Sequence, residues 1–246
     1  MHRLLVESTQ LESDSPVLSK DALNHLRVLR PKDGEKIELF DGRGCWRVCA
    51  YRSDRNAASP LSPVDLQLRR SPSPAPLTLF ACVTKGSRWD WTVEKATELG
   101  VTRIVPVISD RTIVRIAAAE RAAKRERWLR IAEDAARQSD AKWLPEIVSP
   151  VTFAESLAIV RETVCYVGAL TTPPPPSIGE VLRHSTASPR RSSFSLYVGP
   201  EGDFTPDELA SLLAIATPVS FGSTILRAET AAIYGVSVLK SCLDAL

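Results

Sequence analysis

Short apolar runs of the kind that form strands occur in the first 70 positions of the chain, and Val64–Leu68 alternates with a period of two. One stretch departs from this pattern: Asp21–Leu29 is amphipathic at helical spacing, with Ser19 before it and Pro31 after it, which predicts a capped helix. The predicted strands are Ile37–Phe40, Trp46–Tyr51 and Val64–Leu68, the first two joined by the glycine-rich turn Asp41–Gly44. This part of the chain is expected to form a small β-rich domain, arranged as a barrel.

Strands and helices alternate from residue 77 onward. The apolar runs Leu77–Val83 and Ile104–Ile108 predict strands, and Asp90–Leu99 between them predicts a helix that Gly100 closes. A strand, a helix and a second strand in this order are typical of a parallel sheet. The second part of the chain is therefore predicted to have an α/β fold.

The boundary between the two parts lies in Ser71–Pro76, where proline occupies every second position. Such a segment forms neither a helix nor a central strand, so it is predicted to be a semi-rigid linker. The expected domains are residues 1–70 and residues 77–246, separated by the linker over residues 71–76.

A long helix is predicted over Ala117–Gln138, with Trp128, Ile131, Ala132 and Ala135 on one face. The arginine and lysine residues of this helix lie largely off that face. They allow two interpretations: a solvated helix surface, which is the commoner meaning, or a contact with RNA.

Two capping boxes mark helix starts later in the chain. They are Thr152–Glu155 and Thr205–Glu208, and the second has proline at the first helical position. A strand is predicted between them over Val164–Ala169. The final helix, Thr230–Leu246, is apolar on nearly all sides, which indicates burial in the core or in a subunit interface.

The composition is that of a soluble globular protein, with 44% hydrophobic and 24% charged residues. No apolar stretch approaches the ~20 residues that a membrane helix needs. The first residues turn polar too early for a signal peptide, so a cytoplasmic protein is expected.

The cysteine and histidine residues offer little basis for a metal site. The five cysteines include no pair with a partnering histidine cluster, and the chain has three histidines. We therefore expect reduced thiols, no metal ion and no histidine-dependent nucleophilic triad.

Positive charge is concentrated in the N-terminal part of the chain, although the formal net charge of the whole chain is only +2. Residues 1–150 carry 25 basic and 20 acidic side chains, a net of +5, whereas residues 151–246 carry 6 and 9, a net of −3. This asymmetry indicates contact with an anionic macromolecule, although ordinary solvated surfaces explain it about as well.

Two segments near the end of the chain have the pattern of ligand-binding loops. In Tyr197–Phe204 and in Phe221–Ala231, an apolar run stops at a glycine-bearing turn and gives way to a helix, as at the strand ends of open α/β sheets. No glycine-rich nucleotide motif follows the early strand Leu77–Val83, and no P-loop occurs in the chain. A planar ligand of modest charge is favoured over NAD or a triphosphate; the alternative is a pair of plain strand-to-helix turns.

The residues of these and other segments together resemble a known family. It is the bacterial small-subunit ribosomal RNA uridine N3-methyltransferases of the SPOUT class, which use S-adenosylmethionine. The resemblance covers nearly the whole chain, and the segments that carry it are His25–Arg30, Leu39–Gly42, Lys95–Val101, Gln138–Ser139, Gly199–Gly202 and Ile225–Ala231.

The resemblance implies a PUA-like barrel followed by an α/β domain with a parallel sheet and a C-terminal trefoil knot. It also implies a homodimer that acts on ribosomal RNA or the small ribosomal subunit, with the cofactor held by the knot loops. Leu170, Ile225 and Leu226 are expected to enclose the adenine. The complete set of expected cofactor-binding residues is Gly168, Leu170, Gly199, Pro200, Glu201, Gly202, Phe221, Gly222, Ile225 and Leu226.

Methylation of N3 of uracil needs a partner for the developing uracil anion and a route for the N3 proton. Arg227 is the predicted partner, with an ion pair to Glu201 or Glu229 as the alternative. Glu229 and Glu201 are the candidate bases, although a carboxylate at a helix start such as Glu229 also has a structural explanation.

The RNA contacts expected from the sequence are arginines that would bind phosphate groups. They are Arg3, Arg27, Arg30, Arg43 and Arg88.

The chain departs from the family pattern at Asp203, at Ser223–Thr224 and at residues 140–143. The departure at residues 140–143 bears on RNA contacts and substrate choice. The competing hypotheses are a non-catalytic RNA-binding ribosome-assembly factor and, less favoured, a Rossmann-type methyltransferase or dehydrogenase.

Overall fold

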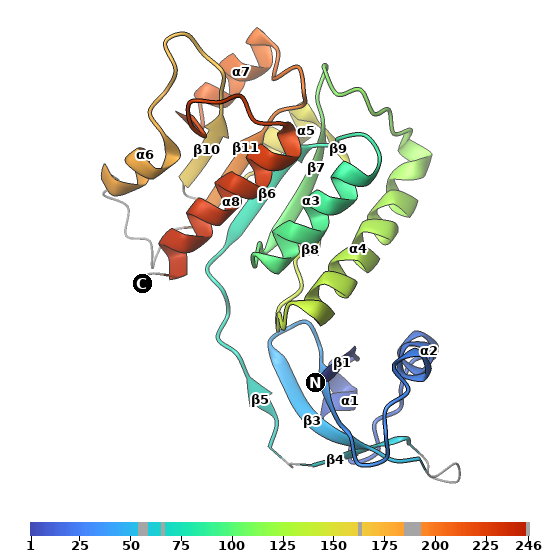
Figure 1. Ribbon diagram of the computed structural model, residues 1–246. Coiled ribbons are helices and arrows are strands. Elements are labelled where there is room, and N and C mark those ends of the chain that lie inside the picture. Colours follow the sequence, from blue (N-terminus) through green and yellow to red (C-terminus); the bar gives the residue numbers. More distant parts are fainter. Residues whose placement is uncertain (54–58, 65–66, 162–163, 185–192, 245–246) are drawn as a thin grey trace. The chain divides into compact units, whose positions relative to one another are not determined.

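The computed structural model describes residues 1–53, 59–64, 67–161, 164–184 and 193–244. The chain divides into two compact units (Figure 1). The first unit contains Met1–Ser73 and Glu133–Leu144; the second contains Pro74–Ala132 and Pro145–Leu246. The division lies inside the predicted linker, but the sequence pattern did not indicate that residues 133–144 group with the first unit.

The first unit is built on a five-stranded sheet with the strand path β1-β2-β3-β4 and with β5 paired to β3. Strands β1 and β2 are parallel, and the other pairs are antiparallel. The elements are β1 (His2–Leu5), α1 (Ser8–Leu11), α2 (Lys20–Leu29), β2 (Lys36–Phe40), β3 (Cys45–Tyr51), β4 (Leu61–Pro63) and β5 (Arg69–Arg70).

Helix α2 forms where the sequence predicts it. The Ser19 side chain accepts a hydrogen bond from the backbone N–H of Ala22, and the helix ends at Arg30, which has a left-handed backbone. Ala22 and Leu26 face the core of this unit, which also contains Leu4, Ile37 and Leu39.

The strand predicted over Val64–Leu68 is wrong in the residues that the structure describes. Strand β4 precedes it, because the buried side chain is Leu61, which pairs with Tyr51 of β3. Val64 is 51% exposed, Gln67 and Leu68 are not in a strand, and residues 65–66 lie outside the described part. The alternation of residue types after residue 63 therefore did not correspond to alternating burial.

The second unit is built on a seven-stranded parallel sheet of order β12-β10-β11-β6-β7-β8, with β9 paired to β7. This confirms the parallel sheet that the strand and helix alternation predicts. The strands are β6 (Leu77–Cys82), β7 (Arg103–Ile108), β8 (Glu146–Ile147), β9 (Val151–Thr152), β10 (Val164–Gly168), β11 (Phe194–Val198) and β12 (Thr217–Val219).

Helices cover both faces of this sheet (Figure 1). One core cluster joins the sheet to α3, α4 and α8 through side chains such as Trp89, Trp128 and Val236. The other joins the opposite face to α5 and α7 through side chains such as Phe153 and Leu212. The helices are α3 (Ser87–Glu98), α4 (Arg121–Gln138), preceded by the 3-10 turn Ala118–Glu120, α5 (Phe153–Ala158), α6 (Ile178–His184), α7 (Pro206–Leu213) and α8 (Ala228–Asp244).

Both predicted capping boxes are present. Thr152 caps α5 with Glu155, and Thr205 caps α7 with Glu208, each by reciprocal side-chain and backbone hydrogen bonds. Helix α3 begins at Ser87 and α8 at Ala228, in both cases earlier than predicted. Within the described residues, no helix is both long enough and apolar enough to span a membrane.

Two of the five cysteines are buried where ionisation is unfavourable. Burial raises the pKa of the Cys49 thiol to about 11 and that of the Cys82 thiol to about 12. All five cysteines are free thiols. The two buried thiols are therefore poor nucleophiles near neutral pH.

Candidate functional site

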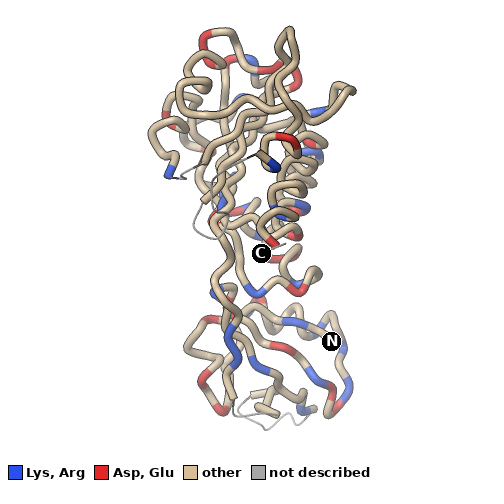
Figure 2. Tube along the Cα trace, turned by 90° about the vertical axis from the view of Figure 1, so that its left-hand side faces the viewer, with Lys and Arg blue, Asp and Glu red and all other residues tan. Residues whose placement is uncertain are grey.

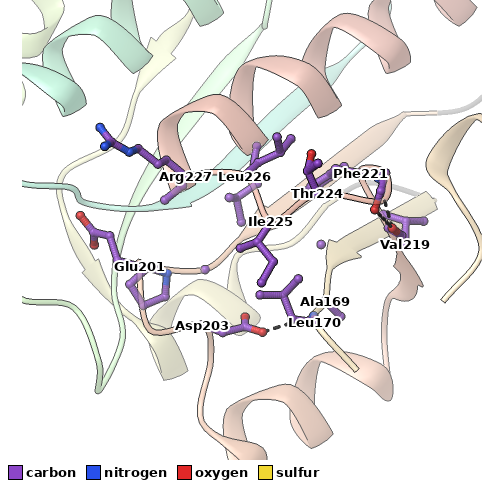
Figure 3. Close-up of a pocket in the computed structure, with 18 residues that line it drawn as sticks. Ala169, Leu170, Glu201, Asp203, Val219, Phe221, Thr224, Ile225, Leu226 and Arg227 are labelled. Atoms are coloured by element: carbon purple, nitrogen blue, oxygen red, sulfur yellow. Dashed lines mark hydrogen bonds between the residues drawn. The ribbon is translucent and has the colours of Figure 1, made fainter. Parts of the chain in front are cut away.

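A pocket of about 250 Å³ lies where the strands of the second unit end (Figure 3). Strands β12, β10 and β11 are neighbours and parallel, so their carboxyl ends meet at the same edge of the sheet. The three segments that follow these strands supply the walls. The lining residues are Gly168–Leu170, Val198–Glu201, Asp203, Val219–Gly222, Thr224–Ala228 and Ala231.

The structure places nearly all of the predicted cofactor-binding residues at this pocket. Nine of the ten line it, and the exception is Gly202. Gly202 belongs to the same loop, but a Cβ there would lie in ordinary contact with Arg111, 3.5 Å from its Cδ. The positions predicted from the sequence therefore lie together in space, and their contact with a cofactor stays a prediction.

The pocket floor depends on an aromatic ring that leaves no room for a side chain at Gly168. A Cβ at this position would lie 2.4 Å from the Phe221 ring, and Phe221 itself packs edge-on against Tyr234 of α8. Gly235 of α8 contacts the same ring, since its Cβ would lie 3.0 Å from Phe221 and 2.5 Å from Leu196. Glycine is required at both places because the ring is confined from several sides.

The loop after β11 is held by its own side chains and by its neighbours. Asp203 has a positive φ of 58° and accepts hydrogen bonds from the backbone N–H groups of Phe204 and Leu170, at 2.8 and 3.3 Å. Arg111 donates to the carbonyl oxygens of Gly202 and Phe204. These contacts hold the loop between β11 and α7, and the buried Phe204 side chain anchors the loop in the core, where it contacts Phe153.

The charged side chains that line the pocket have different partners. Glu201 forms an ion pair with Arg88, with 3.2 Å between Oε1 and Nη1. Arg227 has no recorded ion pair or hydrogen bond from its side chain to any described residue, and it extends away from the pocket centre in Figure 3. The Arg227 ion pair considered from the sequence is absent within the described residues, and Arg88 braces Glu201 instead.

Glu229 does not line the pocket. It lies in the first turn of α8 with an exposed fraction of 8%, and its Oε2 atom has no hydrogen-bond partner within the described part of the chain. A carboxylate at this end of a helix interacts favourably with the helix dipole. The structure therefore favours the structural explanation of Glu229, and its role as a base stays a prediction.

The five arginines expected to bind RNA fall into different environments. Arg27, Arg30 and Arg43 are exposed on the first unit, and Arg88 lies beside Glu201. Arg3 differs, since its side chain is only 6% exposed and pairs with Glu38 at 2.7 Å. It also donates to the backbone carbonyl oxygens of Ala136 and Ala141, so these contacts explain Arg3 as a structural residue and give no support to a phosphate contact.

Several lining residues were not named as contacts from the sequence. Asp203 was noted only as a departure from a family pattern, and Val198 and Ser220 stand next to named residues. Their closeness in the chain to the glycine positions was the available signal. Among the described residues, no group of three histidine, cysteine, aspartate or glutamate side chains is placed to hold a metal ion.

Family models match both parts of the chain. Residues 71–240 match the RNA methyltransferase domain, and residues 18–58 match the RNA methyltransferase PUA domain.

Proteins of similar sequence and solved structures of similar fold are also methyltransferases by name. The ribosomal RNA small subunit methyltransferase E of Synechocystis is 33% identical, over 99% of this chain and 78% of its own. A protein of the same name from Neisseria gonorrhoeae, solved with S-adenosyl methionine, is 26% identical with a TM-score of 0.82 and covers 98% of this chain and 97% of its own. A Legionella pneumophila protein described as a methyltransferase and solved with SAM is 26% identical with a TM-score of 0.77, covering 97% and 96%.

The matched domains span both units, and the pocket lies within the part matched by the methyltransferase model. The similarity extends over nearly the full length of the chain. The chain belongs to the RNA methyltransferase family that includes the ribosomal RNA small subunit methyltransferase E proteins.

Proposed function

We propose that this protein methylates small-subunit ribosomal RNA at N3 of a uridine, with S-adenosylmethionine as the methyl donor. The observation that carries the proposal is the pocket at the ends of β10, β11 and β12, built from three glycine-bearing loops. Similar proteins of this family contain the methyl donor in their structures, which supports the choice of cofactor.

The residues at the pocket fit S-adenosylmethionine. Leu170, Ile225 and Leu226 provide apolar surface for the adenine, and the exposed fractions of Leu170 and Ile225 are 65% and 81% without a ligand. The carboxylate of Asp203 provides a partner for a cationic ligand. Gly168 contributes space, because a Cβ there would press the Phe221 ring out of its position in the wall.

The cofactor supplies an electrophilic methyl group on a sulfonium centre. The loops of this chain hold the ligand and the target base at a fixed distance, a contribution that amounts to several of the ~7–11 kcal/mol available from positioning. Arg227, at the mouth of the pocket and without another ionic partner in the described structure, is proposed to bind a uracil oxygen as negative charge develops on the ring.

The N3 proton has fewer candidate acceptors than the sequence indicated. Glu201 lines the pocket but pairs with Arg88, and Glu229 lies behind the lining in the first turn of α8. We therefore propose that Glu201 holds Arg88 in place and that Glu229 has a structural role in α8. The N3 proton is then lost to solvent at the mouth of the pocket.

RNA is proposed to contact Arg27, Arg30 and Arg43 on the first unit and Arg88 on the second, as phosphate contacts. Lysine, arginine and acidic residues are interspersed along both units (Figure 2), so the contact depends on this group rather than on one uniformly basic surface. A base buried in the stack of an RNA helix must turn outward to reach a pocket of this kind.

We further propose that the segments around the pocket form a trefoil knot and that two chains form a homodimer in the cytoplasm. Apolar side chains that remain exposed in the second unit support an interface. Among them are Leu170, Ile225 and Tyr234, the last on α8 with an exposed fraction of 42%. The family resemblance of the loop sequences supports the knot.

The test is mass spectrometry of nucleosides from 16S-type ribosomal RNA of cells with and without this protein. We expect N3-methyluridine to disappear in its absence and to return when the intact chain is expressed. An unchanged nucleoside profile, together with normal RNA binding by the purified protein, would instead support the non-catalytic assembly factor.

A further inference from the structure

Asp203 differs from every other charged residue in the pocket wall. The charged lining residues are Glu201, Asp203 and Arg227. Glu201 is paired with Arg88, and Arg227 points away from the centre (Figure 3). Within the described residues, the Asp203 carboxylate accepts hydrogen bonds only from backbone N–H groups and has no recorded cationic partner.

The backbone holds this carboxylate in a defined position. Asp203 has φ of 58°, a left-handed conformation that aspartate adopts more readily than most residues other than glycine. Its Oδ1 atom accepts from the N–H of Phe204, and its Oδ2 atom accepts from the N–H of Leu170 on the neighbouring loop. The carboxylate therefore joins two walls of the pocket while remaining part of the lining (Figure 3).

The pocket consequently has an uncompensated negative charge. Arg111, which follows β7, contacts this loop, but it donates to the carbonyl oxygens of Gly202 and Phe204 and has no recorded contact with the Asp203 carboxylate. A cationic group of a ligand in this pocket of about 250 Å³ shares the cavity with the Asp203 carboxylate. In such a site, opposite charges several ångströms apart interact appreciably because solvent screening is reduced.

The methyl donor and its product differ by one positive charge. S-adenosylmethionine has a sulfonium centre, an ammonium group and a carboxylate. When the methyl group leaves, its bonding pair stays on sulfur, so S-adenosylhomocysteine has a neutral thioether; N3 of the uridine gains the methyl group and loses its proton. The two ligands are otherwise alike in shape, so charge is a property by which a pocket can distinguish them.

Resting on the cofactor assignment of the proposed function, we infer that Asp203 makes the pocket select the cationic methyl donor over the neutral product. Its negative charge strengthens binding of the sulfonium form and leaves binding of the thioether form nearly unchanged. The site then releases its product in exchange for new cofactor. This is a specificity role beyond the role of Asp203 in positioning the Leu170 loop.

The experiment is calorimetry of S-adenosylmethionine and S-adenosylhomocysteine binding to the full-length wild type and to Asp203→Asn. Asparagine tolerates the left-handed backbone and keeps one carbonyl oxygen as acceptor, so the substitution removes the charge and one of the two hydrogen bonds from backbone N–H groups. We expect the ratio of the product's Kd to the donor's Kd to fall by roughly tenfold in the variant, with most of the change in the donor's Kd.

Two further variants provide a second removal of the carboxylate and a matched control. Asp203→Gly relieves the positive φ and removes the carboxylate, so it should show the same fall in the ratio even if Asp203→Asn folds poorly. Asp207→Asn is the matched control: it removes one charge from the first turn of α7, outside the pocket lining, and should leave the ratio unchanged.

The outcomes distinguish this inference from the proposed function. If both ligands bind the wild type and both Kd values rise equally in Asp203→Asn, the carboxylate only positions the loop and the inference is wrong. An equal fall of the ratio in Asp207→Asn would also overturn it. If neither ligand binds the folded wild type, the proposed function itself fails.

Discussion

Glu38 in the first unit and Asp203 in the second are both carboxylates held by several hydrogen bonds, but their partners differ. Glu38 is 3% exposed and accepts from two cations, Arg3 at 2.7 Å and Lys142 at 2.5 Å. Asp203 lines an open pocket and accepts only from backbone N–H groups within the described residues. One charge is neutralised inside the fold, whereas the other remains available to a ligand.

This difference shows how the two units use charge. In the first unit, Arg3 and Lys142 connect strands β1 and β2 to the segment that follows α4, so removal of one partner leaves buried charges without compensation. Asp140 belongs to the same network: burial opposes its ionisation, but the hydrogen bond and charge of Lys142 and the charge of Arg3 hold the pKa of its carboxyl below the usual value. At the pocket, unpaired charge is compatible with folding because solvent or a ligand reaches it.

The largest expected effect is on the first unit. Glu38→Ala removes the shared partner of Arg3 and Lys142 and should destabilise this unit by about 3–5 kcal/mol, the usual consequence of breaking a buried ion pair. Hydrogen exchange followed by mass spectrometry should show faster exchange of β1, β2 and β3, with the amides of β10 and β11 little changed.

The exposed residue Glu7 provides the control, since its side chain makes no capping hydrogen bond. Glu7→Ala should change the stability by less than about 0.5 kcal/mol. Equal protection of β1–β3 in the wild type and in Glu38→Ala would contradict the assignment of Glu38 as a buried structural charge.

Arg227 is the test of the second unit, because its charge is proposed for the reaction and not for the fold. Arg227→Ala should lower the turnover of a ribosomal RNA substrate by roughly 100-fold, about 2.7 kcal/mol, the size of effect found when one donor to a developing oxyanion is lost. The melting temperature and the cofactor Kd should change little, since Arg227 has no recorded partner in the described structure.

Arg183 in the last turn of α6 is the matched arginine, exposed and outside the pocket lining. Arg183→Ala should retain nearly full turnover. A loss of cofactor affinity in Arg227→Ala as large as the loss of turnover would mean that Arg227 supports the pocket rather than the reaction.

A smaller effect is expected where the pocket and the core of the second unit share a contact. Gly168→Ala places a Cβ 2.4 Å from the confined Phe221 ring and should cost about 1–3 kcal/mol of stability, as other overpacked sites do. Thermal denaturation should report the loss, and cofactor affinity should weaken because Phe221 lines the pocket.

The matched substitution is Gly179→Ala in α6, where a Cβ would meet only an arginine nitrogen at 3.9 Å. Alanine is the better helix former, so this variant should be more stable by as much as about 1 kcal/mol. Destabilisation of both variants to the same extent would show that the close contact with Phe221 is not the cause.

The accuracy of the sequence-based predictions also differs between the two units. In the second unit, long apolar runs separated by caps predicted β6, β7, β10 and the parallel sheet. In the first unit, strand β1 was missed and the last predicted strand was misplaced, because β1 and β4 are only four and three residues long. The misses in the second unit include β8 and β9, which have two residues each. An apolar pattern this short is weak evidence for a strand, and the neighbouring strands decide whether the segment pairs.

The candidate site shows the same distinction at the level of single residues. Glycine next to an apolar run predicted the loops around Gly199 and Gly222, where it permits close approach of the backbone, and both loops line the pocket. Gly168 was expected there only from the family resemblance. The sequence did not indicate that Arg3 would form a buried ion pair with Glu38, a residue 35 positions away. Nor did it show that Glu229 lies outside the pocket lining while Asp203 is part of it.

The order of apolar runs, the caps and the glycine loops were determined by the sequence alone, because they depend on interactions between residues a few positions apart. The tertiary structure decided which charges are neutralised and which remain free. Nothing in their residue types distinguishes Arg3, Arg227 and Asp203 from other charged residues. Their roles follow from the groups that distant parts of the chain place near them or leave absent. Electrostatic interactions depend on distance in space and on solvent exposure, neither of which is encoded locally.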